Sequence, residues 1–298
     1  MTLRLGVLQY PVTRVASLAE YADKLDRLVA AGAAGGGQLL VMPEYACMEV
    51  AAAFSTEPSP VAERDAVAAV SGEILAIMRA VAQRHGVWLL PGTLPWRSGT
   101  RIVNRAPLIA PDGRLAFQDK QVMTRFEAEH WAIGAGDPQR VFETAWGRVG
   151  IAICYDAEFP SVVRAQVEAG AWLILVPTCT DTMHGFNRVR LSARARAVEN
   201  QCFVAVSPTV GDAPWLATLD CNRGRAGVYG PADRGFPEDG VIAEDADAQG
   251  WLWADLDPAR LHAVREHGAV RNHHDWPPHW SRAEPAAVAE LQPFEDER

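Results

Sequence analysis

The feature that most constrains the fold is a repeated alternation of short, strongly apolar runs with longer segments of helical periodicity. Runs rich in Leu, Ile and Val occur at residues 3–9, 38–42, 87–91, 149–154, 173–177 and 203–207. Segments with apolar residues at helical spacing lie between them, at residues 17–31, 61–84, 161–169 and 188–200. Short, wholly apolar runs are typical of strands buried on both faces, and such strands alternate with helices in layered α/β proteins. The sequence therefore predicts an α/β fold.

The alternation runs through the chain twice. Strands predicted near residues 3, 38, 87 and 102 match those near 149, 173, 203 and 226 in spacing. The first set ends in a hairpin predicted over residues 102–110 and 115–117, and further strands are predicted at residues 226–229, 241–243 and 251–256. Since no linker separates the two sets, we expect two similar halves, packed sheet to sheet, in one domain over residues 1–257.

The composition changes after Asp257. Residues 262–298 hold five of the eight histidines, a Pro-Pro pair and an acidic end. We expect residues 258–298 to form a C-terminal extension with little core of its own, packed on the domain or on a partner subunit. His273, His274 and His279 lie in this extension without the spacing of a known zinc motif, so no metal site is predicted there.

Charge and cysteine content exclude several classes of protein. Lys and Arg number 28 against 37 Asp and Glu, a net charge of −9, which would repel a phosphate backbone and argues against nucleic acid as a partner. The five cysteines include no CxxC pair, so neither a disulfide framework nor a thiolate zinc cage is expected. The chain shows no signal peptide at its first residues and no apolar run long enough to span a bilayer. We therefore expect a cytoplasmic protein with no membrane partner.

Several residues that could carry chemistry stand just after predicted strands. Cys154 ends the strand at 149–154, and the carboxyl end of a strand, before a helix, is where α/β sheets place reactive groups. Glu44 follows the run at 38–42, and Lys120 follows the hairpin. Each has a plain structural alternative: a buried thiol, a turn cap and a surface lysine. No histidine stands in a context that marks it as the base for the cysteine.

Three segments follow one another in a set order. They are Val-Met-Pro-Glu-Tyr around Glu44, Asp-Lys-Gln-Val around Lys120, and Gly-Ile-Ala-Ile-Cys-Tyr-Asp-Ala-Glu-Phe-Pro around Cys154. Together they resemble the nitrilase superfamily of carbon-nitrogen hydrolases, over about residues 3–257. The resemblance implies a four-layer α-β-β-α sandwich and a Glu-Lys-Cys triad of these three residues, with no cofactor or metal. It also implies a further glutamate after the lysine, for which Glu127 is preferred and Glu129 is the alternative.

The resemblance implies a role for each residue. Glu44 takes the proton of Cys154, whose thiol is otherwise mostly neutral because its unperturbed pKa is about 8.5. The thiolate attacks a carbonyl carbon, and the resulting oxyanion is stabilised by Lys120 and by a backbone N–H, expected to be that of Tyr155. Glu44 then protonates the leaving amine and activates water to hydrolyse the thioester. Glu127 holds Lys120 in place and balances its charge.

Three residues are expected to line the substrate pocket. Tyr155 follows the expected nucleophile, and Thr178 and Cys179 follow the strand predicted at 173–177. For Cys179, packing as a small apolar side chain is the alternative.

The sequence thus predicts a thiol hydrolase that cleaves the C–N bond of a small linear amide and releases ammonia or an amine. A nitrile or N-carbamoyl substrate is the alternative, and a catalytically silent binding protein on the same fold is a third interpretation. Tyr155 and Asp156 after the cysteine resemble the amidase branches, whereas nitrilases typically carry Trp-Glu there. Because members of the superfamily commonly pair, we expect a homo-oligomer that forms contacts through the helices predicted at 161–169 and 188–200.

Overall fold

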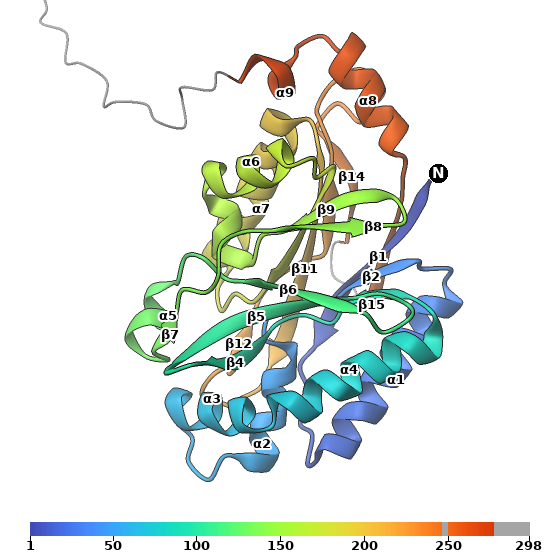
Figure 1. Ribbon diagram of the computed structural model, residues 1–298. Helices are drawn as coiled ribbons and strands as arrows, with labels where there is room; N and C mark the ends of the chain where they lie inside the picture. The colour runs from blue at the N-terminus through green and yellow to red at the C-terminus, as the bar shows by residue number, and fades with distance from the viewer. Residues whose placement is uncertain (246–249, 277–298) are drawn as a thin grey trace, which may run out of the picture.

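The computed structural model describes residues 1–245 and 250–276, and it has two β-sheets that face each other, each covered by helices on its outer side (Figure 1). In order across the first sheet lie β4 (Leu94–Ser98), β5 (Arg101–Ile109), β3 (Trp88–Leu90), β2 (Leu39–Val41), β1 (Leu3–Pro11) and β15 (Gly250–Leu256), with β6 (Leu115–Asp119) and β7 (Ile133–Gly134) paired to β5. The second holds β8 (Val141–Thr144), β9 (Gly147–Ile151), β10 (Leu173–Thr178), β11 (Phe203–Asp212), β13 (Gly227–Tyr229) and β14 (Val241–Glu244), with β12 (Cys221–Asn222) paired to β11. The α-β-β-α sandwich predicted from the sequence is confirmed.

The helices form the two outer layers. On the first sheet lie α1 (Leu18–Ala34), α2 (Ala51–Phe54), α3 (Pro60–Ala69) and α4 (Ser71–His85); on the second lie α6 (Pro160–Glu168) and α7 (Met183–Asn200). The remaining helices are α5 (Arg125–Glu129), α8 (Pro258–His267), α9 (Asn272–Asp275) and the 3₁₀ helices η1 (Ala46–Val50) and η2 (Cys154–Glu158). None of the helices in the described ranges is long and apolar enough to cross a membrane.

Strand β1 shows why the strands read as continuous apolar runs. Leu3, Leu5 and Val7 point into the core between the sheets, whereas Leu8 and Tyr10 pack with the helices on the outer side. A strand alternates its side chains between the two faces of its sheet, and here both faces are buried. The same holds for β2, where Leu39 and Val41 face inward.

Within the described residues, strand pairing joins the two sheets at one place. The last residues of β1 pair in parallel with β11, Tyr10 with Thr209 and Pro11 with Val210. The rest of β1 pairs with β2 on one side and with β15 on the other. The backbone therefore fixes the position of one sheet relative to the other near the carboxyl ends of β1 and β11.

The structure differs from the sequence prediction in the helix expected at 61–84. This segment forms two helices, α3 and α4, with a break at Val70. The Ser71 hydroxyl donates to the Val67 carbonyl and to the carbonyl of Pro95. A serine that bonds to nearby carbonyls offers the backbone an alternative to a continuous helix, and that competition explains the break.

Other boundaries also differ. Strand β9 ends at Ile151, earlier than predicted, because Cys154 has a positive φ of 48° that a strand does not accept. Helix α7 begins earlier than predicted, where the Thr182 hydroxyl accepts a hydrogen bond from the Gly185 N–H. The sequence analysis did not predict the strands β4, β7, β8 and β12 or the helices α2, α5, α8, α9, η1 and η2.

The described part of the predicted C-terminal extension contacts the domain through a few side chains. Helix α8 buries Leu261 and Val264, and Trp276 lies against the guanidinium of Arg164 in α6, 5.0 Å from its ring centroid. Residues 277–298, including His279, lie outside the described residues. The boundary at residue 257 stays a prediction.

Gly92 offers a test of how the first sheet supports the segment that carries Glu44. Its φ is 97°, and a Cβ at this position would collide with the carbonyl oxygen of Pro43. We predict that Gly92→Ala lowers the free energy of unfolding by about 2–4 kcal/mol, through the collision and the backbone strain together. Urea denaturation measures the change.

Gly86→Ala is the matched control. Gly86 also has a positive φ, 63°, but a Cβ there meets no atom within 4 Å. Only the backbone strain should remain, a loss of about 1 kcal/mol. Equal losses in the two variants would show that the contact with Pro43 is unimportant.

Candidate functional site

The residues predicted to carry chemistry meet at one cavity, of about 720 Å³. Glu44 follows β2 and Lys120 follows β6, both in the first sheet, whereas Cys154 follows β9 in the second. Strand β2 runs parallel to β1, and β9 runs parallel to β10; the carboxyl ends of β2, β9 and β10 point toward this region. Glu44, Lys120, Glu127 and Cys154 all line the cavity, so the fold brings together side chains that are far apart in the sequence.

A buried lysine lies at the centre of the site. The Lys120 Nζ is 2.8 Å from Glu44 Oε1 and 2.6 Å from Glu127 Oε2. All three side chains are at most 5% exposed. The Asn104 Nδ2 donates to Glu44 Oε1 at 2.8 Å and lies 3.3 Å from Glu127 Oε1, so it spans the two carboxylates. An ammonium in this position has charged partners on two sides and little water.

Glu127 is fixed by its own helix. It stands in the first turn of α5, where it accepts from the Thr124 N–H at 3.0 Å and the Thr124 hydroxyl at 2.9 Å. The Tyr45 hydroxyl also donates to it, at 2.9 Å. Glu129, the alternative left open by the sequence, is exposed and pairs with Arg125 at 2.8 Å. The geometry thus favours Glu127 as the partner of Lys120.

Cys154 sits at a strained point of the backbone. It is the first residue of η2, with a φ of 48°, a conformation that non-glycine residues seldom adopt. The Thr178 hydroxyl donates to its Sγ at 3.2 Å, and the Sγ lies 3.7 Å from the Cys179 carbonyl oxygen. The turn thus holds the sulfur at the cavity wall, beside the end of β10.

The surroundings shift the acidities of Glu44 and Cys154. Burial raises the pKa of Glu44 to about 7, with Lys120 opposing the shift and Glu127 adding to it. Burial and the nearby Glu44 raise the pKa of the Cys154 thiol well above its ordinary value, although Lys120 opposes this. The thiol is therefore neutral at physiological pH until a base removes its proton, and Glu44 is a base with a suitable pKa.

The other two groups stay charged. Burial alone would raise the pKa of Glu127, but Lys120 and Thr124 hold it below its ordinary value. Burial alone would lower the pKa of Lys120, but Glu127 and Glu44 raise it well above its ordinary value. The cluster therefore contains a permanent ion pair, Lys120 with Glu127, and one carboxyl group, Glu44, that can exchange a proton near neutral pH.

The three residues predicted to line the pocket lie beside the cluster. Tyr155 is half-buried and lines the cavity together with Cys179. The Cys179 N–H donates to Glu44 Oε2 at 3.0 Å, so its backbone also orients the carboxylate. Thr178 is buried and contacts the sulfur, not the open cavity.

The sequence analysis gave no site role to two buried polar residues, Asn104 and Asp156. Asn104 is fully buried in β5, and no local signal marked it, because the polar Arg105 follows it in the strand. Asp156 accepts from the Val122 N–H at 2.8 Å and from the Gln121 N–H at 3.2 Å, which joins the segment after Lys120 to the turn of Cys154. Burial raises the pKa of Asp156 to about 6, with Lys120 opposing the shift.

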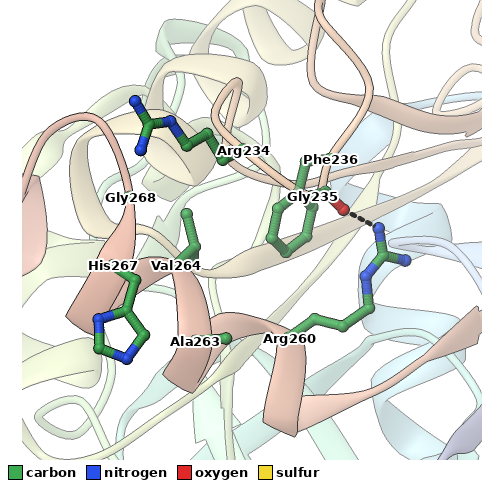
Figure 2. A pocket seen from close by; sticks show the side chains of 8 residues that line it. All are labelled: Arg234, Gly235, Phe236, Arg260, Ala263, Val264, His267 and Gly268. Carbon is green, nitrogen blue, oxygen red and sulfur yellow. Dashed lines mark hydrogen bonds between the residues drawn. The ribbon is translucent and has the colours of Figure 1, made fainter.

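A second, smaller depression of about 280 Å³ is separate from the cluster. Figure 2 shows it between α8 and the segment before β14, where Arg260 donates to the Gly235 carbonyl and lies over the Phe236 ring. The residues that line it include Arg234 and His267 but none of those predicted to carry chemistry. Within residues 1–245 and 250–276, no group of three or more His, Cys, Asp or Glu side chains could hold a metal ion.

Removal of the central ammonium tests the charge balance of the cluster. Lys120→Met leaves Glu44 and Glu127 buried without a cation, so we predict a loss of about 3–5 kcal/mol in the free energy of unfolding near neutral pH. The folded-state pKa values of both carboxyls then rise above the unfolded values. Because protonation relieves the buried charge, the loss relative to the parent protein should shrink as the pH falls from about 8 to about 5. Urea denaturation at both pH values measures this.

Arg125→Met is the control, since its ion pair with Glu129 is exposed. We expect no measurable change in stability at either pH. A Lys120→Met deficit that stays the same at both pH values would contradict the charge argument.

Comparison with known proteins places this geometry in a family. The family model for carbon-nitrogen hydrolases matches residues 4–229. The chain is 31% identical over 270 residues to a probable hydrolase, YhcX, of Bacillus subtilis, and the match covers 90% of this chain and 52% of that protein. It therefore spans about half the length of that relative. This chain is also 26% identical over 278 residues to the omega-amidase NIT2 of Xenopus tropicalis, and the match covers 90% of this chain and 93% of that protein.

Solved structures show the same architecture. The NitFhit protein of C. elegans superposes with a TM-score of 0.73 at 22% identity, over 89% of this chain and 63% of that chain. A variant of the amidase from Nesterenkonia sp. AN1, solved after Michael addition of acrylamide at its active-site cysteine, has a TM-score of 0.66 at 25% identity, over 89% and 97% of the two chains. The family model spans most of the chain, and the fold agrees with it. This protein belongs to the carbon-nitrogen hydrolase family, and it is an enzyme of the nitrilase superfamily.

Proposed function

We propose that this enzyme is an amidase that cleaves the C–N bond of a small linear amide through a thioester on Cys154. The observation that carries the proposal is the buried cluster of Glu44 and Lys120 at the same cavity as Cys154. Acyl transfer by a thiol requires a base for the nucleophile and a cation for the oxyanion. Because the pKa of Cys154 is raised, the base is essential here, and Glu44 titrates near neutral pH beside the fixed cation of Lys120. Relatives named as amidases support the choice of amides.

The first half-reaction acylates the sulfur. The Glu44 carboxylate, which lines the same cavity as Cys154, takes the proton of its thiol. The sulfur then attacks the amide carbon and forms a C–S bond, and the negative charge moves to the oxygen. The Lys120 ammonium and the backbone N–H of Tyr155 stabilise this oxyanion. Glu44 returns the proton to the nitrogen, the C–N bond breaks, and ammonia or an amine leaves.

The second half-reaction releases the acid. Glu44, again ionised, takes a proton from water, and the hydroxide attacks the thioester carbon. The C–S bond breaks, and the thiolate regains its proton from Glu44. Glu127 takes no part in these transfers and keeps Lys120 charged and in place. One carboxylate thus serves both steps because its pKa of about 7 lets it hold or release a proton.

We propose further that the substrate is a small linear amide, that the enzyme forms a homo-oligomer and that it is located in the cytoplasm. Amides are preferred to nitriles because an amide gives an oxyanion that Lys120 can bind, whereas a nitrile gives a thioimidate that must gain protons on nitrogen.

The experiment that tests the function is an ammonia-release assay over matched amides, nitriles and N-carbamoyl compounds, with Cys154→Ala beside the parent enzyme. We expect turnover to be highest for amides. In Cys154→Ala it should fall below about a hundredth of the parent rate, because the covalent nucleophile is lost. Cys47→Ala is the control, since Cys47 is buried and does not line the cavity. Substantial activity in Cys154→Ala would overturn the assignment, and higher kcat/KM for nitriles would change the substrate.

The pH dependence tests the base. Glu44 must be ionised to act, so kcat/KM should fall on the acid side with an apparent pKa of about 7. Asp156 is the rival group, because its pKa is raised to about 6. We predict that Asp156→Asn keeps the acid limb of the profile near its parent position. Loss of that limb in Asp156→Asn would assign it to Asp156 instead of Glu44.

A further inference from the structure

A buried carboxylate outside the catalytic cluster holds one wall of the cavity. Glu63 lies in the first turn of α3 and is only 2% exposed. Its Oε1 accepts from the Ala217 N–H at 2.8 Å, and its Oε2 accepts from the Thr218 N–H at 2.9 Å and from the Thr218 hydroxyl at 2.6 Å. One carboxylate therefore satisfies three donors from two consecutive residues, far from it in the sequence.

These two residues belong to a segment with few other polar anchors. Residues 213–220 connect β11 to β12, and Ala217 and Thr218 line the cavity. In this connection the Leu216 N–H donates to the Ala213 carbonyl, the Ala213 N–H donates to the Asp220 carbonyl, and the Asn222 side chain donates to the Leu219 carbonyl at 2.7 Å. In the described part of the chain, Glu63 is the acceptor for both the Ala217 and Thr218 N–H groups. A buried N–H needs an acceptor, so this carboxylate fixes the path of the backbone there.

The next residue of α3 fastens a second wall. Arg64 is buried, and its guanidinium donates to the carbonyl oxygen of Trp131. Trp131 lines the cavity and packs against Tyr45, with ring centroids 4.7 Å apart. Glu63 and Arg64 thus attach two walls of the cavity to one short helix that has no catalytic group of its own.

We propose that Glu63 is a specificity-determining positioning residue, which sets the shape of the acyl-binding part of the cavity by holding Ala217 and Thr218 in the wall. This inference rests on the proposed function, because it takes the cavity beside Cys154 as the place of the acyl group. Glu63 does not line the cavity and touches no reacting atom. Glu63 affects the substrate only through the position of this wall. It therefore influences the binding of longer acyl chains and leaves the cleavage of the C–N bond unchanged.

The chemistry of the contact requires a carboxylate. Both oxygens of Glu63 accept hydrogen bonds from N–H groups of adjacent residues. Glutamine has the same shape but presents an NH₂ in place of one oxygen, and this group would face a backbone N–H donor. Two donors cannot form a hydrogen bond with each other, so the glutamine amide can accept only some of the hydrogen bonds from Ala217 and Thr218. Glu63→Gln therefore loosens the wall without opening a cavity in the core.

The test measures kcat and KM of Glu63→Gln for a homologous series of linear amides, from acetamide to hexanamide. We expect KM for the longest amides to rise about tenfold, while kcat for acetamide stays within about twofold of the parent value. Thr218→Val, which removes only the hydroxyl donor, should give a smaller rise in the same direction. Glu73→Gln is the matched control, because Glu73 stands in the first turn of the neighbouring α4 but is exposed, and it should change neither constant.

Hydrogen exchange provides a readout that needs no substrate. In Glu63→Gln, amides of residues 213–222 should exchange faster than in the parent, while those of β10 and α7 stay unchanged. An unchanged KM series together with unchanged exchange in residues 213–222 would overturn the proposal. So would an equal loss of activity for all amides with faster exchange throughout the protein, which is the mark of a merely structural residue.

The proposal and the proposed function fail in different ways. If the parent enzyme hydrolyses no amide, the function is wrong, and exchange alone then decides whether Glu63 holds the wall. If the parent hydrolyses amides and Glu63→Gln keeps the parent selectivity for chain length, the inference about Glu63 is wrong and the function stands.

Discussion

The site depends on an ammonium group held out of water between two carboxylates. The two carboxylates around this cation differ in pKa because their surroundings differ. Thr124 and Tyr45 donate to Glu127, which stays ionised, whereas burial raises the pKa of Glu44 to about 7. Chemically identical side chains thus differ in pKa, and the proposed mechanism uses Glu127 as a fixed counter-charge and Glu44 as the proton carrier. The remaining parts of the site position a sulfur and a substrate against this arrangement.

Much of the fold and the core of the site could be predicted because their signals are local. A strand buried on both faces, such as β1, has a continuous apolar run, and a charged residue directly after such a run stands out. Glu44 stood out in this way, whereas Lys120 follows two polar residues of a hairpin strand and had a plain structural alternative. Both were assigned to the site because the segments around them and around Cys154 form an ordered set of motifs typical of one superfamily. The four-layer sandwich followed from that resemblance.

The contacts that the sequence did not reveal join distant residues. Nothing near Glu63 indicates that its partners are Ala217 and Thr218, and nothing near Asn104 indicates that it contacts Glu44. The break between α3 and α4 also depends on a remote group, the Pro95 carbonyl that Ser71 contacts. Helical periodicity continues across that break, because the apolar positions on both sides face the same core.

The groups proposed to be catalytic come from both halves of the sandwich. Glu44 and Lys120 stand at the ends of strands of the first sheet, and Cys154 stands at the end of a strand of the second, with the pairing of β1 and β11 as the backbone link between the sheets. Neither sheet alone carries a nucleophile together with its base. Under the proposed function, a chain whose sheets have not docked holds a thiol without its base. Competence for acyl transfer is then a property of the complete sandwich and of neither half alone.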